Sequence, residues 1–547
     1  MSGDGVETRS APLEALRAAL RAGRHDQALA LASAATDAGL AHPLLLQVAA
    51  AALAQIGRFD EALALHEKAA GLAPADPAVR AAMGECLFAA QRPEAALAAW
   101  RQALDLAPKD PTLMCGKARV LASLGHGEEA AALFAAAQVA DPGRLEAPFG
   151  LARLALEAGR LDEADRLVRA LLARAPGQPD FLWLAGRLGL ARGDHQAAAA
   201  FLEKIAAIPG LPAAQRAETQ LALGEALDGL GRTSEAFALA VEAKAIQRRL
   251  YAGRAAGREG ETARFVRLAA WFERADPDAW KAAPRKDPPA DPAPTHAFLV
   301  GFPRSGTTLL EQALAGHPGV QTLEEAPTLA AHFAEFLSSA AGCARLARLD
   351  ADQADAWRAR YWAEARAHGI GSSGGLFVDK APAGTLSLPL IAKLFPDAKI
   401  LFALRDPRDV VLSCLRNAFQ MNAMTYAFTT LEETAACYCA CMAMAEVYRR
   451  VLALDLIEVR HEVLVEDFDG ELARIAGFLG IDDRPAMRDV AATARRSTVR
   501  TPSGPQVRLG LNREGIGRWR AYAGKLAPVA GMLEPWVRRF GYPADGP

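Results

Sequence analysis

A glycine-bearing turn in the second half of the chain has the residue types that bind an anion. It reads GFPRSGTTLLEQALAGHP from Gly301. Compared with the nucleotide-binding pattern G-x-x-x-x-G-K-(S/T), it keeps Gly301, Gly306 and Thr308 but has Thr307 in place of lysine. A turn that opens a helix still offers backbone N–H groups and the positive end of the helix dipole. Because the lysine is missing and Arg304 lies in the turn, we expect a phosphoanhydride other than a triphosphate; a chance glycine loop is the alternative.

A second segment pairs an arginine with a serine and reads RDPRDVVLSCLRN. Arg405 follows an apolar run that predicts a strand, and ligands of open parallel sheets gather at that end of a strand. Ser413, about two turns into the predicted helix, can present its hydroxyl to the same anion. Arginine suits a phosphate monoester because it donates two parallel hydrogen bonds. For the aspartates we favour a structural role, in which Asp406 caps a helix beginning at Pro407 and Asp409 completes its acidic first turn.

Together, PRSGTTL and RDPRD-x3-S resemble the 5′-phosphosulfate loop and the 3′-phosphate site of sulfotransferases that use 3′-phosphoadenylyl sulfate (PAPS). The similarity spans about residues 295–545 and points to the protein-tyrosine sulfotransferase branch, in the form that bacteria fuse to tetratricopeptide repeats. It implies in-line sulfuryl transfer from PAPS to a hydroxyl, release of 3′,5′-adenosine bisphosphate, and no requirement for a metal. It also implies a donor site made of Arg304, Ser305, Gly306, Thr307, Thr308, Arg405, Ser413, His461 and Arg518.

The resemblance assigns the chemistry to a few side chains. HPGVQTLEEAPTL is similar to the family's HP-x-V-x-x-x-EE, which makes Glu325 the base that accepts the acceptor's proton. FVDKAP is similar to NK-x-P, which puts Lys380 beside the transferring group, where it and Arg304 stabilise negative charge. Two structural alternatives stay open. In the first, Glu324 and Glu325 cap a helix beginning near Pro327; in the second, Lys380 is a surface lysine after a strand.

The segment SGPQVRLGLNREGIGRWRAY resembles the family's closing segment over the donor. By this resemblance Ser503 contacts the sulfuryl or bridging oxygen, and Arg518 reaches the 3′-phosphate side. Arg508 and Arg513 either help or belong to a solvated basic loop.

The sequence departs from the family's pattern in two places. His461 stands where the family commonly has tyrosine, and an arginine expected late in the 3′-phosphate helix falls at Asn417, with Arg416 beside it. Both departures concern affinity for the donor rather than the chemistry.

A parallel sheet covered by helices is expected to position these residues. Short apolar runs alternate with helical stretches, as in α/β domains of the P-loop kind. The predicted strands lie near residues 297–300, 320–323, 376–378, 400–404 and 456–459.

The first half of the chain carries a repeat of 34 residues with the signature GR-x-(D/E)-x-A. Its glycine allows a left-handed helix end, the alanine five residues later lets helices approach closely, and proline starts the next unit. The glycines are Gly23, Gly57, Gly125, Gly159, Gly193 and, after an insertion near 209–212, Gly231, with Gln91 in the third unit. The alanines are Ala28, Ala62, Ala96, Ala130, Ala164, Ala198 and Ala236, and the prolines on the same grid are Pro43, Pro77, Pro111 and Pro179.

This pattern resembles tetratricopeptide repeats, about seven of them over roughly residues 10–250. Such a helical solenoid presents a concave face that binds a protein or peptide partner. A structural stalk or dimerisation arm is the alternative.

We therefore expect an all-α repeat solenoid over residues 1–250, a helical and proline-rich linker over 251–294, and a sulfotransferase domain over 295–547. In the linker, Trp271, Phe272 and Trp280 are the expected packing residues, and RKDPPADPAP marks the boundary.

Composition narrows the class of protein. The 547 residues include 62 basic and 64 acidic ones, so the net charge of −2 gives no general reason to bind nucleic acid. The seven cysteines are too scattered for a disulfide framework, and those at 437, 439 and 441 cannot converge on a metal from one helix. No apolar run suits a membrane span or signal peptide. We expect a soluble, cytoplasmic protein.

The leading hypothesis is a PAPS-dependent sulfotransferase whose repeat array recruits a protein partner or acceptor. Peptidyl tyrosine is the acceptor that the resemblance suggests, while a saccharide, lipid or small phenol would use the same donor site. Two alternatives remain: a kinase or nucleotide hydrolase built on the same loop, and a repeat scaffold with a non-catalytic C-terminal domain.

Overall fold

The computed structural model describes residues 12–19, 22, 24–282, 295–371, 375–496, 504–508 and 510–543. The chain forms two compact units, residues 1–188 and 189–547. Within the described residues, no helix combines the length and the apolar character that a membrane span requires.

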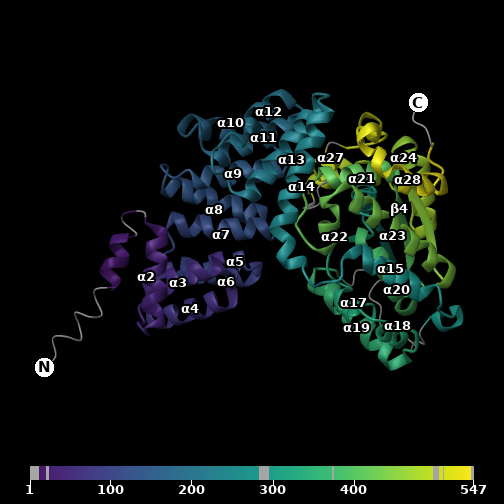
Figure 1. Ribbon diagram of the computed structural model, residues 1–547, viewed down its shortest axis with the longest axis horizontal. Coiled ribbons are helices and arrows are strands. Elements are labelled where there is room, and N and C mark those ends of the chain that lie inside the picture. Colours follow the sequence, from purple (N-terminus) through teal and green to yellow (C-terminus); the bar gives the residue numbers. More distant parts are fainter. Residues whose placement is uncertain are drawn as a thin grey trace. The chain divides into compact units, whose positions relative to one another are not determined.

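The first unit consists of helices joined by short turns, drawn from purple to blue in Figure 1. After a helical stretch at 12–19, its helices are α2 (His25–Asp37), α3 (Pro43–Gln55), α4 (Phe59–Leu72), α5 (Pro77–Ala89), α6 (Pro93–Leu106), α7 (Pro111–Ser123), α8 (Gly127–Ala140), α9 (Glu146–Glu157), α10 (Leu161–Arg174) and most of α11 (Pro179–Arg192).

The repeat signature acts as predicted wherever the structure describes it. The signature glycines from Gly57 onward have positive φ, between 72° and 91°, and Gln91 adopts the same conformation with a φ of 59°. All seven signature alanines are at most 1% exposed, so each lies in a helix contact. The four prolines begin α3, α5, α7 and α11. Gly23 lies outside the described residues.

The second unit begins with helices that precede the sheet: α12 (His195–Ala206), α13 (Ala213–Gly229), α14 (Thr233–Ala255), α15 (Glu261–Phe272) and the 3-10 helix η1 (Pro277–Trp280). Phe272 and Trp280 are buried and pack against each other and against Trp271, as predicted. The unit border at 188/189 precedes the predicted domain border at 250, so α13 and α14 belong to the same compact unit as the sheet. Of the predicted linker over 251–294, residues 251–282 are described and helical for the most part, whereas the whole proline-rich stretch RKDPPADPAP lies outside the described residues.

A five-stranded sheet with the order β2-β3-β1-β4-β5 forms the centre of the second unit, and every strand pair is parallel. The five predicted strands are confirmed, each one to three residues longer than expected. They are β1 (Thr295–Gly301), β2 (Val320–Glu324), β3 (Leu376–Lys380), β4 (Lys399–Leu404) and β5 (Asp455–Arg460).

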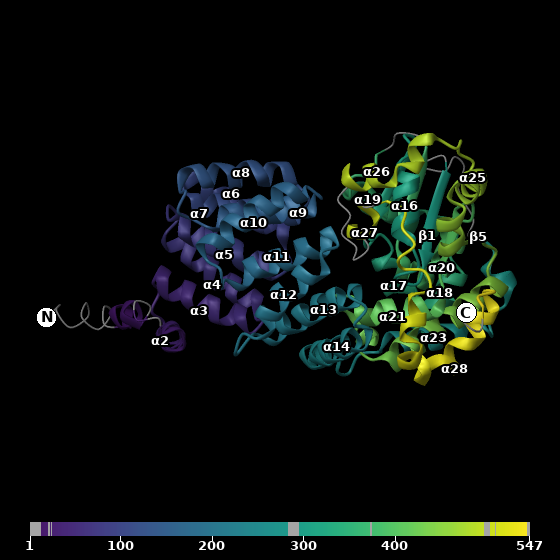
Figure 2. The ribbon, with the colours of Figure 1, turned by 90° about the horizontal axis from the view of Figure 1, so that it is seen from above.

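Helices cover both faces of this sheet, as can be followed in Figure 2. Alternate residues of β1 face opposite sides, so Phe298 and Val300 join one core while Ala297 and Leu299 join the other. The first core includes residues of α15, α18 (Ala340–Ala347), α19 (Ala351–Ala367), α20 (Leu388–Leu394), α21 (Pro407–Arg416), α23 (Leu431–Val451) and α28 (Ala523–Arg539). The second includes residues of α16 (Thr307–Ala315), α24 (His461–Glu466), α25 (Phe468–Leu479) and α26 (Val490–Arg496).

Short elements complete the second unit. They are α17 (Ala330–Phe336), η2 (Pro382–Ser387), α22 (Ala423–Tyr426), η3 (Ala427–Thr429), η4 (Pro485–Arg488), α27 (Gly504–Arg508) and η5 (Arg518–Tyr522). The predicted fold class, a helical solenoid followed by an α/β domain with a parallel sheet, is confirmed.

Candidate functional site

The carboxyl ends of all five strands lead into residues that the sequence singled out. Because the strands are parallel, these ends meet at one edge of the sheet, where open α/β sheets bind ligands. In the order of the sequence, these residues are Arg304 shortly after β1, Glu325 directly after β2, Lys380 at the end of β3, Arg405 after β4 and His461 after β5. The fold therefore gathers residues from five distant segments.

The turn between β1 and α16 has a constrained backbone. A Cβ at Gly301 would lie 2.6 Å from the carbonyl oxygen of Ala403, and one at Gly306 would lie 2.5 Å from His461 Nδ1. Gly306 also has a φ of 93°, and Arg304 has a φ of 72°, which is rare for a residue with a side chain. Strained residues of this kind concentrate at functional sites. Gly306 is the N-cap of α16 and has no side chain to accept from its first N–H groups.

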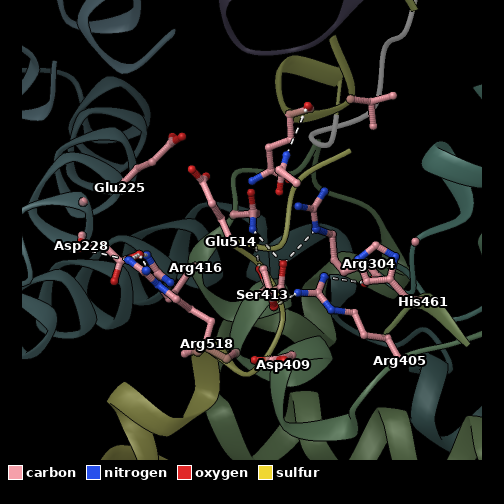
Figure 3. Close-up of a pocket in the computed structure, with 18 of the residues that line it drawn as sticks. Glu225, Asp228, Arg304, Arg405, Asp409, Ser413, Arg416, His461, Glu514 and Arg518 are labelled. Atoms are coloured by element: carbon pink, nitrogen blue, oxygen red, sulfur yellow. Dashed lines mark hydrogen bonds and ion pairs between the residues drawn. The ribbon is translucent and has the colours of Figure 1, made fainter. Parts of the chain in front are cut away.

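A pocket of about 420 Å³ opens beside this turn, a volume within the range of small-molecule sites (~300–1,000 Å³). Figure 3 shows how its charged residues converge. Arg304 Nε donates to Ser413 Oγ at 2.9 Å, and Arg405 Nη1 donates to the Arg304 carbonyl oxygen at 3.2 Å. Arg405 also donates to the carbonyl oxygen of Gly515. The glycine turn and the second predicted segment are thus in direct contact.

Burial and mutual repulsion set the charge states in this pocket. Burial, together with the nearby Arg405, lowers the pKa of Arg304 to about 10, so its guanidinium stays charged at neutral pH. Burial lowers the pKa of His461 to about 3, and both arginines add to the effect. His461 is therefore a neutral imidazole at neutral pH.

The aspartates of the second segment are structural, as predicted. Asp406 is the N-cap of α21 and accepts from the backbone N–H of Arg408 at 3.0 Å. Asp409 accepts from the backbone N–H groups of Gly517 and Trp519, both at 2.7 Å, and so holds the C-terminal segment against the pocket. Burial raises the pKa of Asp409 to about 6.

Asn417, where the resemblance expects an arginine, and its neighbour Arg416 both line the pocket. Asn417 Nδ2 donates to Ser413 Oγ at 3.2 Å and so orients that hydroxyl. Arg416 and Arg518 both form ion pairs with Asp228 of α13.

The sequence did not single out several residues that line this pocket. His195 belongs to α12, and Glu225 and Asp228 belong to α13, all within the predicted repeat array. Their positions in the 34-residue grid are ordinary helix positions, so no local signal marked them. Arg416 was noted only as a neighbour of Asn417.

A second charged cluster surrounds Lys380, whose side chain is fully buried. Its Nζ lies 3.0 Å from a Glu325 oxygen and 3.3 Å from oxygens of both Glu311 and Glu324. Burial alone would lower the pKa of Lys380, but the three carboxylates raise it above its usual value. Burial raises the pKa of Glu311 to about 7, against the opposing charge of Lys380. Glu311 is a further member of this charged cluster that no motif in the sequence indicated.

This cluster decides the two structural alternatives. The alternative of Glu324 and Glu325 as helix caps is wrong, because α17 begins at Ala330 and its N-cap, Leu329, has no side-chain hydrogen bond. The alternative of Lys380 as a surface lysine is wrong as well, because its side chain is buried among carboxylates. Glu325 has a φ of 49° and donates its N–H to the Lys380 carbonyl oxygen at 2.8 Å.

The remaining predicted residues differ in their placement. Gly306, Thr308 and Arg518 line the pocket. Ser305 and Thr307 are buried beside it without being among its lining residues. Arg513 is exposed and Arg508 half-buried, and neither lines the pocket. Ser503 lies outside the described residues. In the part of the chain that the structure describes, no group of three or more His, Cys, Asp or Glu is arranged to hold a metal ion.

Comparisons with known proteins agree with the two halves of this architecture. Residues 296–485 match the model of the sulfotransferase family, and residues 53–114 and 149–212 each match a tetratricopeptide-repeat family. An uncharacterized protein of Aquifex aeolicus is 26% identical over 259 residues, which cover 46% of this chain and 34% of that protein. The nodulation protein NoeE of Sinorhizobium fredii is 28% identical over 226 residues, which cover 35% of this chain and 51% of NoeE.

The chain thus spans about a third and about half of the length of these two relatives. Among solved structures, the type IV pilus biogenesis factor PilW overlaps with 37% of this chain and 92% of its own, at 19% identity and a TM-score of 0.34. The family matches confirm the sulfotransferase and tetratricopeptide-repeat parts of the resemblance seen in the sequence. The chain carries tetratricopeptide repeats followed by a domain of the sulfotransferase family.

Proposed function

We propose that this chain transfers a sulfuryl group from PAPS to a hydroxyl acceptor. The observation that carries the proposal is the contact between the glycine turn and the second segment. Arg304 and Ser413, 109 residues apart in the sequence, share a hydrogen bond, and Arg405 bonds to the backbone of the turn. One ligand with an anionic group at each end can therefore engage both segments.

The pocket offers such a ligand guanidinium groups and unmet hydrogen-bonding capacity, although Glu225, Asp228, Asp409 and Glu514 also line it. Four arginines line it: Arg304, Arg405, Arg416 and Arg518. The Nε of Arg405 is buried, and no described residue accepts a hydrogen bond from it. A buried donor without an acceptor costs about 1–3 kcal/mol, which an anionic oxygen would offset.

The residues divide between the two ends of the donor. The first N–H groups of α16 and Arg304 are suited to the phosphosulfate end, because they present a helix N-terminus and a guanidinium. Arg405, Ser413 and Arg518 are suited to a 3′-phosphate, with Ser305, Thr307, Thr308 and His461 supporting the turn. When bound, PAPS supplies an activated sulfuryl group and leaves as 3′,5′-adenosine bisphosphate. Each charge-assisted hydrogen bond contributes about 1.5–3 kcal/mol.

Glu325 is the proposed base that accepts the acceptor's proton. Its side chain is 47% exposed, while the lysine that it contacts is buried, so one oxygen is held and the carboxylate stays accessible. A positioned base contributes about 10²–10⁴ to the rate. Lys380 and Arg304 bring positive charge to the negative charge that develops during transfer. By the family resemblance, Ser503 is a further contact for the transferring group.

The acceptor carries a hydroxyl, and peptidyl tyrosine is our proposal for it. The repeat array supports a protein acceptor or partner, because solenoids of helix pairs bind proteins along their concave face. Mass spectrometry of the labelled product tests this point. A sulfated saccharide, lipid or small phenol as the sole product would overturn the tyrosine assignment.

Ligand-dependent thermal stability separates this proposal from a nucleotide-dependent kinase or hydrolase. We expect 3′,5′-adenosine bisphosphate to raise the melting temperature at concentrations where ATP with Mg²⁺ does not, because a ligand stabilises the folded state that binds it. Stabilisation by ATP with Mg²⁺ alone would contradict the proposal.

Transfer of radiolabelled sulfate from PAPS into a cell lysate separates an enzyme from a scaffold with a non-catalytic domain. We expect the wild-type protein to label an acceptor and Arg304→Ala to lose most of that labelling. Equal labelling by the two proteins, or none by the wild type, would contradict a catalytic role for this site.

A further inference from the structure

A buried carboxylate from the helices before the sheet lies in the wall of the pocket. Helix α13 presents one face to the pocket, formed by Leu221, Gly224, Glu225 and Asp228, which are spaced as neighbours on a helix surface. Asp228 is only 8% exposed. Burying a carboxylate costs free energy unless it is paired with groups of opposite charge. The groups that pair with Asp228 therefore indicate what this residue does.

Three groups converge on Asp228 from the sulfotransferase domain. Arg416 Nη2 lies 2.5 Å and Arg518 Nη2 lies 2.6 Å from Asp228 Oδ2, and the hydroxyl of Tyr522 donates to Oδ1. Arg518 Nη2 also donates to the backbone oxygen of Asp228 at 3.1 Å. Figure 3 shows Asp228 directed toward both guanidinium groups. Burial would raise the pKa of Asp228, but Arg416, Tyr522 and Arg518 hold it below its usual value, so the carboxylate is charged.

The next helix secures the same side of the pocket. Lys244 of α14 is buried and donates to the carbonyl oxygen of Asn417 at 2.8 Å. Asn417 in turn donates to Ser413, the hydroxyl beside Arg304. Arg248 of α14 forms an ion pair with Glu433 of α23. The helix pair α13/α14 is therefore joined to α21 and the C-terminal segment by charged and hydrogen-bonded contacts.

Asp228 fixes its two arginines without using up their donors. A free arginine side chain loses rotamer entropy when it is ordered, and a guanidinium carries five N–H donors. Arg518 and Arg416 line the pocket and keep further donors while paired. A carboxylate that holds them in place lowers the entropic cost of binding an anion.

We propose that Asp228 is a positioning residue for the donor's 3′-phosphate, acting through Arg416 and Arg518. The last helix pair of the repeat array is then part of the donor site and sets the preference for a 3′-phosphorylated nucleotide. This inference rests on the proposed function, since it presumes that the pocket binds such a nucleotide.

Calorimetric binding of two nucleotides to the full chain tests the proposal. We expect Asp228→Asn to weaken binding of 3′,5′-adenosine bisphosphate ~10-fold or more, because the neutral amide holds two guanidinium groups less well. Binding of adenosine 5′-monophosphate, which lacks the 3′-phosphate, should change less than ~2-fold. If the role of Asp228 were purely structural, Asp228→Asn would weaken the binding of both nucleotides to the same extent. The matched control is Glu235→Gln, which removes an exposed ion pair between Glu235 of α14 and Arg232, the N-cap of that helix.

The outcomes separate this inference from the proposed function. If the wild-type protein does not prefer the bisphosphate, the proposed function fails. Two other outcomes would overturn the positioning role, given a wild type that prefers the bisphosphate. In one, Asp228→Asn binds the bisphosphate as tightly as the wild type or more tightly; in the other, Asp228→Asn weakens the binding of both nucleotides alike.

Should Asp228→Asn not fold, Tyr522→Phe carries the test, because it removes one hydrogen bond to Asp228 and keeps the aromatic ring. We then expect ~2- to 3-fold weaker bisphosphate binding and unchanged monophosphate binding; no change in either would contradict the proposal.

Discussion

Two charged clusters in the second unit use opposite arrangements. In one, the buried cation Lys380 is surrounded by carboxylates, and its partner Glu325 is 47% exposed. In the other, the buried anion Asp228 lies between arginines, and its partner Arg518 is 38% exposed. In each, a buried group orients an exposed group of opposite charge. The two exposed groups therefore suit different reactants: an exposed carboxylate can accept a proton, and an exposed guanidinium can bind an anion.

The largest effect is expected from the exposed carboxylate of the first cluster. Glu325→Gln keeps the shape of the side chain but removes its ability to accept a proton. We expect kcat for sulfate transfer to fall by about 10²–10⁴, while calorimetric binding of 3′,5′-adenosine bisphosphate changes little.

Glu324→Gln is the matched comparison for that variant. Glu324 contacts the same lysine but is only 18% exposed, so we expect a smaller loss of kcat. A larger loss for Glu324→Gln than for Glu325→Gln would indicate that Glu324, and not the more exposed Glu325, accepts the proton.

The buried cation of the first cluster should matter for stability. Lys380→Met leaves Glu311, Glu324 and Glu325 without their shared partner. Because removing one member of a buried charge cluster leaves the others uncompensated, we expect a loss of about 3–5 kcal/mol in the free energy of unfolding. Urea unfolding measures it.

Lys399→Met is the control for that variant, since Lys399 pairs with Asp455 at a partly exposed position on β4. An exposed pair contributes about 0–1 kcal/mol, so the control should be nearly neutral. Equal losses in the free energy of unfolding for the two lysine variants would show that the cluster around Lys380 contributes no more to stability than a partly exposed ion pair.

The arginines of the second cluster and its neighbours should matter for binding. Arg405→Ala removes the guanidinium that contacts the glycine turn and whose buried Nε donates to no residue that the structure describes. We expect binding of 3′,5′-adenosine bisphosphate to weaken by about 1.5–3 kcal/mol, roughly 10- to 150-fold. Arg538→Ala, which removes an exposed arginine paired with Glu534, is the control. Unchanged affinity in Arg405→Ala would remove Arg405 from the donor site.

Local signals explain what the sequence predicted. Gly57 and Gly306 have a positive φ, which glycine tolerates best. The spacing of such glycines in the sequence therefore indicated the repeat turns and the turn before α16. The strands were predicted from short apolar runs, and Arg405 was singled out because it directly follows one of these runs. Each of these features depends on neighbours within a few residues.

Long-range contacts explain what the sequence did not predict. Asp228 meets Arg518 across 290 residues, and Glu311 meets Lys380 across 69, so neither pairing leaves a local pattern. Asp228 occupies a helix position in the repeat whose identity the 34-residue grid does not restrict. The division of the chain at 188/189, inside the predicted repeat array, likewise follows from contacts between α13, α14 and the sulfotransferase domain.

The smallest expected effect concerns Glu311 and pH. Its folded-state pKa of about 7 lies above the ordinary value near 4.3, so between these values the folded protein binds a proton that the unfolded chain has released. This contribution to stability is fully present below pH ~4.3 and is lost as the pH rises through about 7. Between pH 5 and 8 we expect the wild type to lose on the order of 2 kcal/mol relative to Glu311→Gln, measured by urea unfolding.

Glu466→Gln, at an exposed carboxylate of α24, is the control for this pH dependence and should track the wild type at both pH values. If Glu311 is neutral below pH 7, Lys380 interacts only with the other two carboxylates of the cluster and holds the exposed carboxylate of Glu325 more strongly. Above pH 7, a third carboxylate competes for the same ammonium group. A stability difference between wild type and Glu311→Gln that does not change with pH would mean that Glu311 is ionised throughout and that the cluster carries three negative charges around one positive charge.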